Sequence, residues 1–321
     1  MIDLANICRA WNLSPVLSSV QAETGTIHRT FLLKTISGKY ALRAYRYTAE
    51  ERWRIVCEHN LIAYVRDHNL PAVAPVPLSH GETILEHEGR FYALYPFASG
   101  HQVARGYLGT GEIIAMGKFL GQLHRVLLNY PHEQVPQRAL TVDHAATFMT
   151  IDTIETAIRS QKRISEEDQQ VLSQLAERRQ WLMTARPVDE KAFLSVERQV
   201  IHGDYQETNL FFEGNRVSAA IDWDQAYVAP RAWEVVRTLH YVFQLEEMAC
   251  CLFLDAYRRE MPLAFTELEI VAATYEWIKA HDLWHYTALY LEDNQRVRRF
   301  LQPEPFFLFA TRWVALRNSL H

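Results

Sequence analysis

The sequence predicts an α+β fold in two lobes, a small antiparallel sheet with a helix followed by a larger, mainly helical part. Three observations predict this fold. Short apolar runs separated by turn residues fill residues 16–45, which is typical of a β-meander. Apolar residues at helical spacing follow at 49–69 and dominate again from residue 111. We therefore expect one lobe at residues 1–97 and a second at 98–321.

Composition indicates an ordinary globular chain and excludes several classes of protein. Of 321 residues, 49% are hydrophobic and 22% charged, and the net charge is −5, whereas nucleic-acid-binding proteins are normally basic. No apolar run approaches the roughly 20 residues of a membrane helix, and the start lacks the pattern of a signal peptide. We expect neither a nucleic-acid nor a membrane partner. No sequence pattern predicts a particular oligomeric state.

The four cysteines include no Cys-x-x-Cys pair, which predicts structural thiols in a reducing cytoplasm.

The elements of the small lobe follow from local patterns. Apolar residues predict a helix at 2–11, which Asn12 and Pro15 end. Runs of strand-forming residues then predict strands, and the turn Glu88-Gly89-Arg90 predicts a later hairpin. The expected strands are 16–20 leading into 22–27, 30–35, 39–45, 83–87 and 91–95.

In the larger lobe, helical periodicity predicts most elements. Ser165 followed by three acidic residues is typical of a helix N-terminus. The expected helices are 111–128, 150–162, 165–184 and several within 243–321. Two apolar runs joined by a turn at Asn215 predict a hairpin near the middle of the lobe.

The strongest chemical pattern surrounds that hairpin. His202, Asp204 and Asn209 fit the protein-kinase catalytic loop H-R-D-x-x-x-x-N, with Gly203 in place of the arginine. Asp222 follows thirteen residues after Asn209, where the second metal ligand of that pattern belongs. The hairpin brings these two side chains close together.

The residue types suit phosphoryl transfer, which depends on positioning and charge neutralisation. Asp204 is the candidate catalytic residue, because one carboxylate must accept or orient the proton of the acceptor hydroxyl. Mg²⁺ prefers oxygen ligands, so Asn209 and Asp222 are the candidate metal ligands, and the ATP phosphates supply further oxygens.

The loop at residues 202–209, followed by Ile221-Asp222-Trp223, resembles the aminoglycoside phosphotransferase and choline kinase superfamily. Type II homoserine kinases and methylthioribose kinases share this pattern. The resemblance covers about residue 15 to about residue 245. It implies a protein-kinase-like fold, with ATP and Mg²⁺ bound between a nucleotide-binding lobe and a catalytic, acceptor-binding lobe.

The resemblance also implies residues that contact the nucleotide. Arg43 stands where kinases carry a lysine on the third strand, with Arg46 as the alternative. Glu58 is expected to pair with Arg43, and Glu51 would replace it if the helix docked one turn away.

Thr24 and Gly25 belong to a candidate phosphate-covering loop. Residues 95–98 form the expected hinge beside the adenine. Pro96 has no N–H group, so Phe97 or Ala98 would donate a hydrogen bond there.

Acceptor residues are harder to predict. Asp224 follows the metal segment, and Asp282, His285 and Glu292 lie in an aromatic stretch that either forms a core helix or lines the acceptor site. His281 and His285 lie four apart but lack the glutamate of the zinc motif. His124 is expected in the core, and Glu234 is expected to pin the catalytic loop.

Together, these patterns predict an enzyme that transfers the γ-phosphate of ATP to a hydroxyl of a small metabolite. A homoserine-like amino alcohol is favoured as the acceptor. The alternatives are an aminoglycoside phosphotransferase, a protein Ser/Thr kinase of the same superfamily, and a non-catalytic nucleotide-binding regulator.

Overall fold

The computed structural model describes residues 4–13, 15–22, 28–301 and 309–320. The chain divides into two compact units. The first combines Met1–Gln137 with Arg198–Pro262, and the second combines Arg138–Glu197 with Leu263–His321. Residues 138–197 are therefore an insertion that packs with the C-terminal helices.

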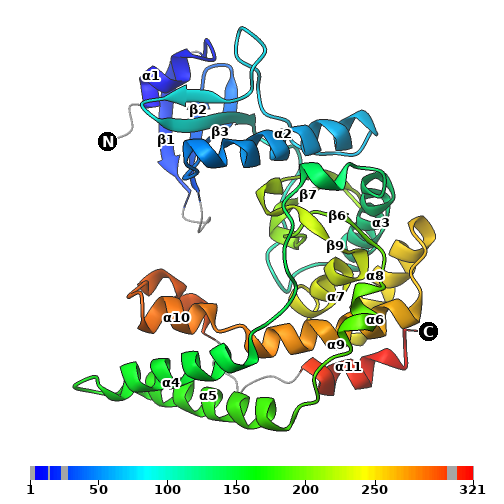
Figure 1. Cartoon of the computed structure of the whole chain (residues 1–321). Coiled ribbons are helices and arrows are strands. Elements are labelled where there is room, and N and C mark those ends of the chain that lie inside the picture. Colours follow the sequence, from blue (N-terminus) through cyan, green and yellow to red (C-terminus); the bar gives the residue numbers. More distant parts are fainter. Residues whose placement is uncertain (1–3, 14, 23–27, 302–308, 321) are drawn as a thin grey trace. The chain divides into compact units, whose positions relative to one another are not determined.

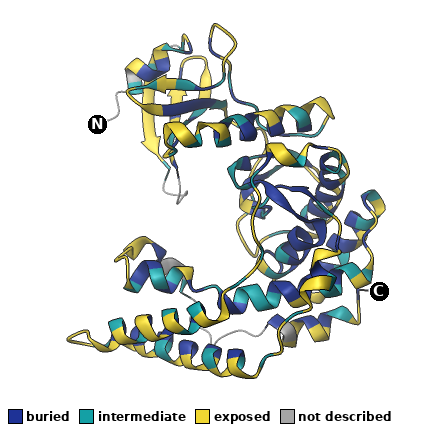
Figure 2. Ribbon diagram, viewed as in Figure 1, coloured by how far each residue is buried: buried dark blue, intermediate teal, exposed yellow. Residues whose placement is uncertain are grey.

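The first unit begins with a five-stranded antiparallel sheet in the order β1-β2-β3-β5-β4. Figure 1 labels β1, β2 and β3 of this sheet. Its strands are β1 (Val16–Gln21), β2 (Arg29–Thr35), β3 (Gly38–Ala44), β4 (Leu85–His87) and β5 (Arg90–Pro96). The expected meander and hairpin are confirmed, while the extension at 23–27 lies outside the described residues. β1 forms one edge of the sheet and is exposed along almost its whole length (Figure 2).

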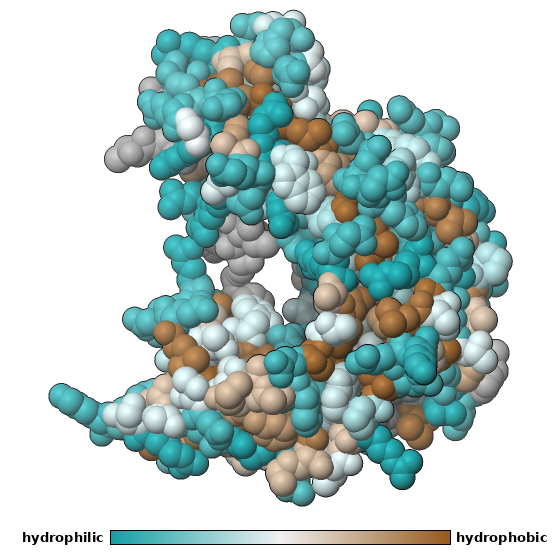
Figure 3. Space-filling model, viewed as in Figure 1, coloured by the Kyte–Doolittle hydropathy of each residue, from teal (hydrophilic) through white to brown (hydrophobic). Residues whose placement is uncertain are grey.

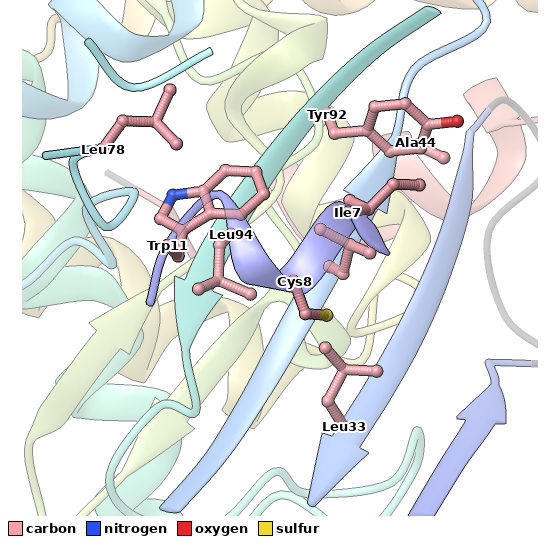
Figure 4. Close-up of a cluster of buried hydrophobic side chains, with 9 residues drawn as sticks. Ile7, Cys8, Trp11, Leu33, Ala44, Leu78, Tyr92 and Leu94 are labelled. Carbon is pink, nitrogen blue, oxygen red and sulfur yellow. The ribbon is translucent and has the colours of Figure 1, made fainter. Parts of the chain in front are cut away.

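Helices α1 (Leu4–Arg9) and α2 (Arg52–Asp67) bury opposite faces of the sheet. Side chains alternate along a strand, so Tyr92 and Leu94 of β5 pack against α1. Phe91 and Ala93 pack instead with Ile55 of α2. Figure 4 shows the first of these clusters, whose labelled members are Ile7, Cys8, Trp11, Leu33, Ala44, Leu78, Tyr92 and Leu94. The sheet is thus fixed from both sides.

The rest of the first unit consists of helices around two small antiparallel sheets. The helices are α3 (Thr110–Leu127), α7 (Arg231–Tyr241) and α8 (Glu247–Glu260), and the strand pairs are β6 (Arg198–Ile201) with β9 (Tyr227–Pro230) and β7 (Leu210–Phe212) with β8 (Val217–Ala220). Short 3₁₀ turns are η1 (Ala49–Glu51), η2 (His132–Gln134), η3 (Glu207–Asn209) and η4 (Trp223–Gln225).

Helices α3 and α8 approach each other closely because two glycines of α3 lack side chains. A Cβ atom at Gly117 would lie 2.2 Å from the Phe253 carbonyl oxygen, and one at Gly121 would lie 2.7 Å from that of Tyr257. This approach places His124 of α3 beside Tyr257.

The second unit is helical where it is described. It contains α4 (His144–Arg159), α5 (Glu166–Thr184), α6 (Glu190–Leu194), α9 (Phe265–His281), α10 (Trp284–Tyr290), η5 (Gln295–Phe300) and α11 (Phe309–Arg317). Its core contains Ile151, Ile154 and Ile158 of α4 packed with Val171 and Leu175 of α5.

Helix caps determine where the helices of this unit begin. The Ser165 hydroxyl accepts a hydrogen bond from the Asp168 amide at 3.1 Å, and the Asp168 carboxylate accepts one from the Ser165 amide at 2.8 Å. The expected start of α5 is therefore confirmed. α4 begins at His144, earlier than the expected 150, because the Asp143 carboxylate caps it through the Ala146 amide at 2.9 Å.

Hydrophilic side chains cover most of the surface around the N-terminal sheet in the space-filling view (Figure 3). Within the described ranges, no helix has the length and apolarity needed to cross a membrane.

Replacing Leu94 by alanine tests the core around α1. The Leu94 side chain is fully buried, so Leu94→Ala should lower the free energy of unfolding by about 2–5 kcal/mol through lost burial and a new cavity. Leu17→Ala, at a 58% exposed position of β1, is the matched control and should change it by less than about 0.5 kcal/mol. Urea unfolding curves measure the free energy of unfolding of both variants. Equal losses in the two would contradict the burial of Leu94 in this core.

Candidate active site

The loop at 202–209 connects β6 to β7 and begins with a turn that only glycine fits. Gly203 has a φ of +81°, and a Cβ atom there would lie 2.0 Å from the Gln225 carbonyl oxygen. The arginine of the protein-kinase loop therefore cannot occupy this position. The departure from the H-R-D pattern is a steric consequence of the close approach of residue 225.

The buried carboxylate of Glu234 on α7 holds this loop. It is 1% exposed and accepts hydrogen bonds from the backbone amides of His202 at 3.0 Å and Gly203 at 2.6 Å. It also accepts one from His124 Nε2 at 3.0 Å, and Nδ1 of that ring is 2.8 Å from the Tyr257 hydroxyl. Glu234 therefore pins the loop and His124 is buried, as the sequence indicated, and the structure adds that the two side chains are hydrogen-bonded partners.

Two opposing effects act on the pKa of Glu234. Burial raises it, but hydrogen bonds and charges contributed by His124, His202 and the Gly203 amide outweigh burial, and the pKa lies below its usual value. Glu234 is therefore a carboxylate that anchors the loop through charge-assisted hydrogen bonds.

His202 connects the loop to the segment that carries Asp222. Its Nδ1 accepts a hydrogen bond from the Asp204 amide at 3.3 Å, so Nε2 carries the hydrogen and donates it to the Ile221 carbonyl oxygen at 3.0 Å. The Ile221 amide in turn donates to the Asn209 carbonyl oxygen at 3.0 Å. These bonds bring the two predicted segments side by side.

The backbone at Asp222 is left-handed, with φ 67° and ψ 58°. This conformation costs a non-glycine residue about 1–2 kcal/mol, and aspartate is among the residues that tolerate it best. It turns the chain sharply at the end of the hairpin.

The Asp204 carboxylate is held by three hydrogen-bond donors. Arg237 Nη2 donates to Oδ1 at 2.6 Å, while Gln206 Nε2 and Asn209 Nδ2 donate to Oδ2 at 2.9 and 2.8 Å. Asn209 Nδ2 also donates to the Asp204 carbonyl oxygen at 2.8 Å, so its Oδ1 is the atom suited to a cation. The structure thus brings Asp204 and Asn209 into direct contact.

Arg43 of β3 links α2 to the Asp222 segment. Its Nη1 donates to Glu58 Oε1 at 2.8 Å, and its Nη2 forms an ion pair with Asp222. The alternative partner, Glu51, instead accepts a hydrogen bond from the Thr48 amide at the start of η1, at 3.2 Å. The structure therefore pairs Arg43 with Glu58.

Glu58 lies in a buried polar cluster between the sheet and α2. Tyr45 donates a hydrogen bond to its Oε2 at 2.9 Å, and the Tyr45 and Tyr95 hydroxyls are 2.9 Å apart. Burial raises the pKa of Glu58 to about 7, although the charge of Arg43 opposes this shift.

His59 belongs to the same cluster. Its Nδ1 is 2.7 Å from the Thr83 hydroxyl, and its Nε2 is 3.0 Å from the Tyr95 hydroxyl. Burial lowers the pKa of His59 to about 4, and the charge of Arg43 adds to this shift. The ring is therefore neutral at pH 7.

Asp224 lies two residues after Asp222 but contacts His28. The carboxylate is 3.1 Å from His28 Nε2, and both side chains are almost completely buried. Burial raises the pKa of Asp224, but His28 and Arg43 reverse the shift, so that it lies below its usual value. Asp222 differs, because burial and the neighbouring Asp224 together raise its pKa against the effect of Arg43. An acceptor contact for Asp224 remains a prediction.

The hinge candidates follow β5. The Phe97 amide donates to the Lys39 carbonyl oxygen at 3.1 Å and so continues the pairing with β3. Ala98 is therefore the better candidate for a donor to a base. Thr24 and Gly25 lie outside the described residues.

Asp282, His285 and Glu292 lie in the second unit. The Asp282 carboxylate accepts hydrogen bonds from Lys279 Nζ at 2.5 Å and from the Trp284 amide at 3.4 Å, and Glu292 is exposed. His285 packs on Tyr286. Burial lowers the pKa of His285 to about 4, and the charge of Arg178 adds to this shift. Their acceptor role remains a prediction.

His281 makes its contacts away from His285. Its Nε2 is 2.8 Å from His144 Nδ1, and its Nδ1 donates to the Trp277 carbonyl oxygen at 2.7 Å. Across the residues that the structure describes, no three His, Cys, Asp or Glu side chains group in a way that would hold a metal ion.

Sequence reasoning missed Arg237, Arg105 and His28. One local signal was available for Arg237, which lies three residues after Glu234 and so shares a face of α7 with it. No local signal distinguishes Arg105 or His28, because their carboxylate partners lie more than a hundred residues away.

The fold is that of known antibiotic phosphotransferases. An AMP-bound spectinomycin phosphotransferase matches 96% of this chain and 97% of its own, with a TM-score of 0.63 and 13% identity. A macrolide 2′-phosphotransferase from Brachybacterium faecium matches 94% of this chain and 98% of its own, with a TM-score of 0.57 and 16% identity. The predicted kinase-like α+β fold class is confirmed.

The family follows from the sequence match. Residues 19–262 match the model of the phosphotransferase enzyme family, and the chain therefore belongs to this family. It is 26% identical over 276 residues to a homoserine kinase from Caulobacter vibrioides, covering 83% of this chain and 80% of that protein. It is also 30% identical over 90 residues to stress response kinase A from Escherichia coli, covering 27% of this chain and 26% of that protein.

Gly203→Ala tests the tight turn of the loop. An added Cβ atom would press on the Gln225 carbonyl oxygen, so this variant should be less stable than Gly214→Ala by about 1–3 kcal/mol. Gly214 is a matched control, since its φ is also positive at +55° but no atom lies within 4 Å of the added Cβ. Thermal unfolding measures the stability of both variants. Equal stability of the two would contradict the close contact between residue 203 and the Gln225 carbonyl oxygen.

The buried ring of His59 should make stability depend on pH. Because its pKa is about 4 in the folded chain and about 6.5 when unfolded, the unfolded state binds more protons between these values. Stability present above pH 6.5 should therefore be lost as the pH falls towards 4, by up to about 1.4 kcal/mol per pH unit.

His59→Gln should remove the contribution of His59 and so change the slope from that of the native chain, whereas His80→Gln, at an exposed position, should keep the native slope. Glu58, whose raised pKa of about 7 contributes with the opposite sign, is present in all three chains. Urea unfolding at pH 7, 6 and 5 measures the slopes. The same slope in the native chain and in His59→Gln would show that another group is responsible.

Proposed function

We propose that this chain transfers the γ-phosphate of ATP to a hydroxyl group of a small metabolite, with a homoserine-like amino alcohol as the favoured acceptor. The observation that carries the proposal is the Asp204 carboxylate, which Arg237, Gln206 and Asn209 hold in one orientation. A carboxylate fixed in this way beside a cation-binding segment suits a reaction that depends on positioning.

In the proposed reaction, the acceptor hydroxyl oxygen forms a bond to the γ-phosphorus, and the bond to the β–γ bridging oxygen breaks. ADP leaves with the electron pair of that bond, and the hydroxyl proton passes to Asp204. Asp204 orients the hydroxyl before transfer, since both of its oxygens are fixed by neighbouring side chains.

The residues present fit a magnesium ion. The Asn209 amide oxygen and the Asp222 carboxylate are hard oxygen donors, which Mg²⁺ prefers, and ATP phosphates complete such a set. When bound, the ion neutralises charge on the phosphate oxygens. Arg43 is the phosphate-binding cation in this proposal, and Glu58 keeps its guanidinium in place.

We assign nucleotide binding to residues 1–97, with Thr24 and Gly25 over the phosphates and Ala98, or Phe97, beside the base. Residues 98–321 supply catalysis and acceptor binding. This functional division differs from the packing of the chain, in which residues 98–137 and 198–262 belong to the first unit. Asp224, Asp282, His285 and Glu292 stay candidates for acceptor contacts.

The acceptor class rests on the extent of the sequence likeness. Similarity to a homoserine kinase extends over 276 residues, whereas the antibiotic phosphotransferases share the fold at 13–16% identity. A cytoplasmic location is proposed with this function, because Cys8, Cys57, Cys250 and Cys251 are all free thiols.

Asp204→Ala should reduce phosphoryl transfer by at least about 10²–10⁴-fold, because it removes the group that orients the hydroxyl and accepts its proton. Nucleotide binding should persist, since Arg43 and Glu58 are untouched. The control is Glu213→Ala, which removes an exposed carboxylate paired with Arg216 and should leave transfer unchanged.

The measurement is ATP consumption with Mg²⁺ and a panel of homoserine, choline, ethanolamine, methylthioribose, kanamycin and a protein substrate. Acceleration by one acceptor that disappears in Asp204→Ala supports the proposal. Full transfer activity in Asp204→Ala would refute the mechanism. ATP binding with no acceptor-stimulated turnover in the native chain would favour the alternative of a non-catalytic nucleotide-binding regulator.

A further inference from the structure

Two arginines lie over one aromatic ring beside the catalytic loop. The guanidinium carbon of Arg105, in the segment between β5 and α3, is 4.5 Å from the ring centroid of Tyr241. That of Arg237 is 5.2 Å from the same centroid. Arg237 and Tyr241 are four residues apart on α7, so they share one face of that helix. We call Arg105, Arg237 and Tyr241 the arginine cluster.

The arginine cluster contacts Asp204 directly and through Gln206. Arg237 donates to Asp204 Oδ1 at 2.6 Å. Arg105 Nη2 donates to Gln206 Oε1 at 2.8 Å, and the amide nitrogen of the same glutamine donates to Asp204 Oδ2 at 2.9 Å. An acceptor whose hydroxyl reaches Asp204 therefore lies beside Arg237, and Arg105 is separated from the same carboxylate by one glutamine side chain.

The exposed charge of the arginine cluster is mainly positive. Arg105 forms an ion pair with Glu207 at 2.8 Å, but the arginine side chain is 40% exposed while that of Glu207 is 0% exposed. Of this ion pair, the Arg105 side chain is therefore the member that is accessible to a bound molecule. Arg237 and Asp204 are about equally exposed, so their charges offset each other at the surface.

We infer that the arginine cluster selects an acceptor that carries an oxyanion, first of all a carboxylate, close to its hydroxyl group. This rests on the proposed function and deepens it. Arginine presents planar, paired N–H donors that match a carboxylate or a phosphate, and it retains its charge at any physiological pH. Polycationic acceptors such as aminoglycosides are disfavoured, because an ammonium group brought near the loop would be repelled by the exposed side chain of Arg105.

Within the cluster, the two arginines have different roles. Arg237 holds Asp204 and is a positioning residue, so its removal should slow transfer to every acceptor. Arg105 does not contact Asp204 itself and is the specificity-determining residue. A test of specificity therefore uses Arg105.

The experiment compares homoserine with homoserine amide, in which the negative charge is absent and the hydroxyl unchanged. Glycerol 3-phosphate and glycerol form a second pair that distinguishes a phosphate from a carboxylate. Binding of each compound is measured by calorimetry with a non-hydrolysable ATP analogue and Mg²⁺, and kcat and KM are measured with ATP. The variants are Arg105→Gln, Arg105→Lys and Arg105→Glu.

Arg216→Gln is the matched control, because Arg216 is an exposed arginine that pairs with Glu213. We expect the native chain to bind one anionic compound at least 10-fold more tightly than its uncharged partner. Arg105→Gln should raise Kd and KM for that compound 10- to 100-fold, with a much smaller effect on the uncharged partner. Arg105→Lys should retain part of the preference, and Arg105→Glu should reverse it.

Equal binding of charged and uncharged partners by the native chain would overturn the inference, as would equal losses for both in Arg105→Gln. The binding measurements test the preference for an oxyanion without requiring that the chain phosphorylate any acceptor. Failure of the proposed function is distinct from these outcomes, since it would appear as binding of the anionic compound without phosphorylation of any acceptor.

Discussion

The buried carboxylate of Glu234 is the interaction on which the rest of the site depends. A buried charge is costly unless it is paired and hydrogen-bonded, and this one is satisfied by His124 and by the backbone amides of residues 202 and 203. These hydrogen bonds connect α3, α7 and the loop through one side chain. Because Arg237 lies three residues further along α7, the same helix also orients the Asp204 carboxylate.

A second group of charged side chains couples the sheet to the segment that carries Asp222. Arg43 pairs with Glu58 of α2 and with Asp222, and hydroxyl groups of Tyr45 and Tyr95 complete the surroundings of Glu58. The opposite pKa shifts of Glu58 and His59 share one main cause, since burial disfavours the charged form of each. The position of α2 and the conformation at Asp222 are thus physically linked.

Much of the fold and part of the site were predictable, because their signals are local. Short apolar runs separated by turn residues marked the strands, and the cap at Ser165 marked the start of α5. The spacing of Asp204, Asn209 and Asp222 identified one loop and one hairpin, and the structure places these segments together. The start of α4 was wrong by about six residues, because the Asp143 cap was overlooked.

Local sequence patterns were enough to predict the type of most elements, the family resemblance and the residues of the central loop, since each depends on neighbours close along the chain. The folded structure was needed to show that Glu58 rather than Glu51 pairs with Arg43, because that choice depends on how α2 docks on the sheet. It also showed that Gly203 faces the Gln225 carbonyl and that Arg105 pairs with Glu207. Such contacts join distant segments, so no local pattern predicts them.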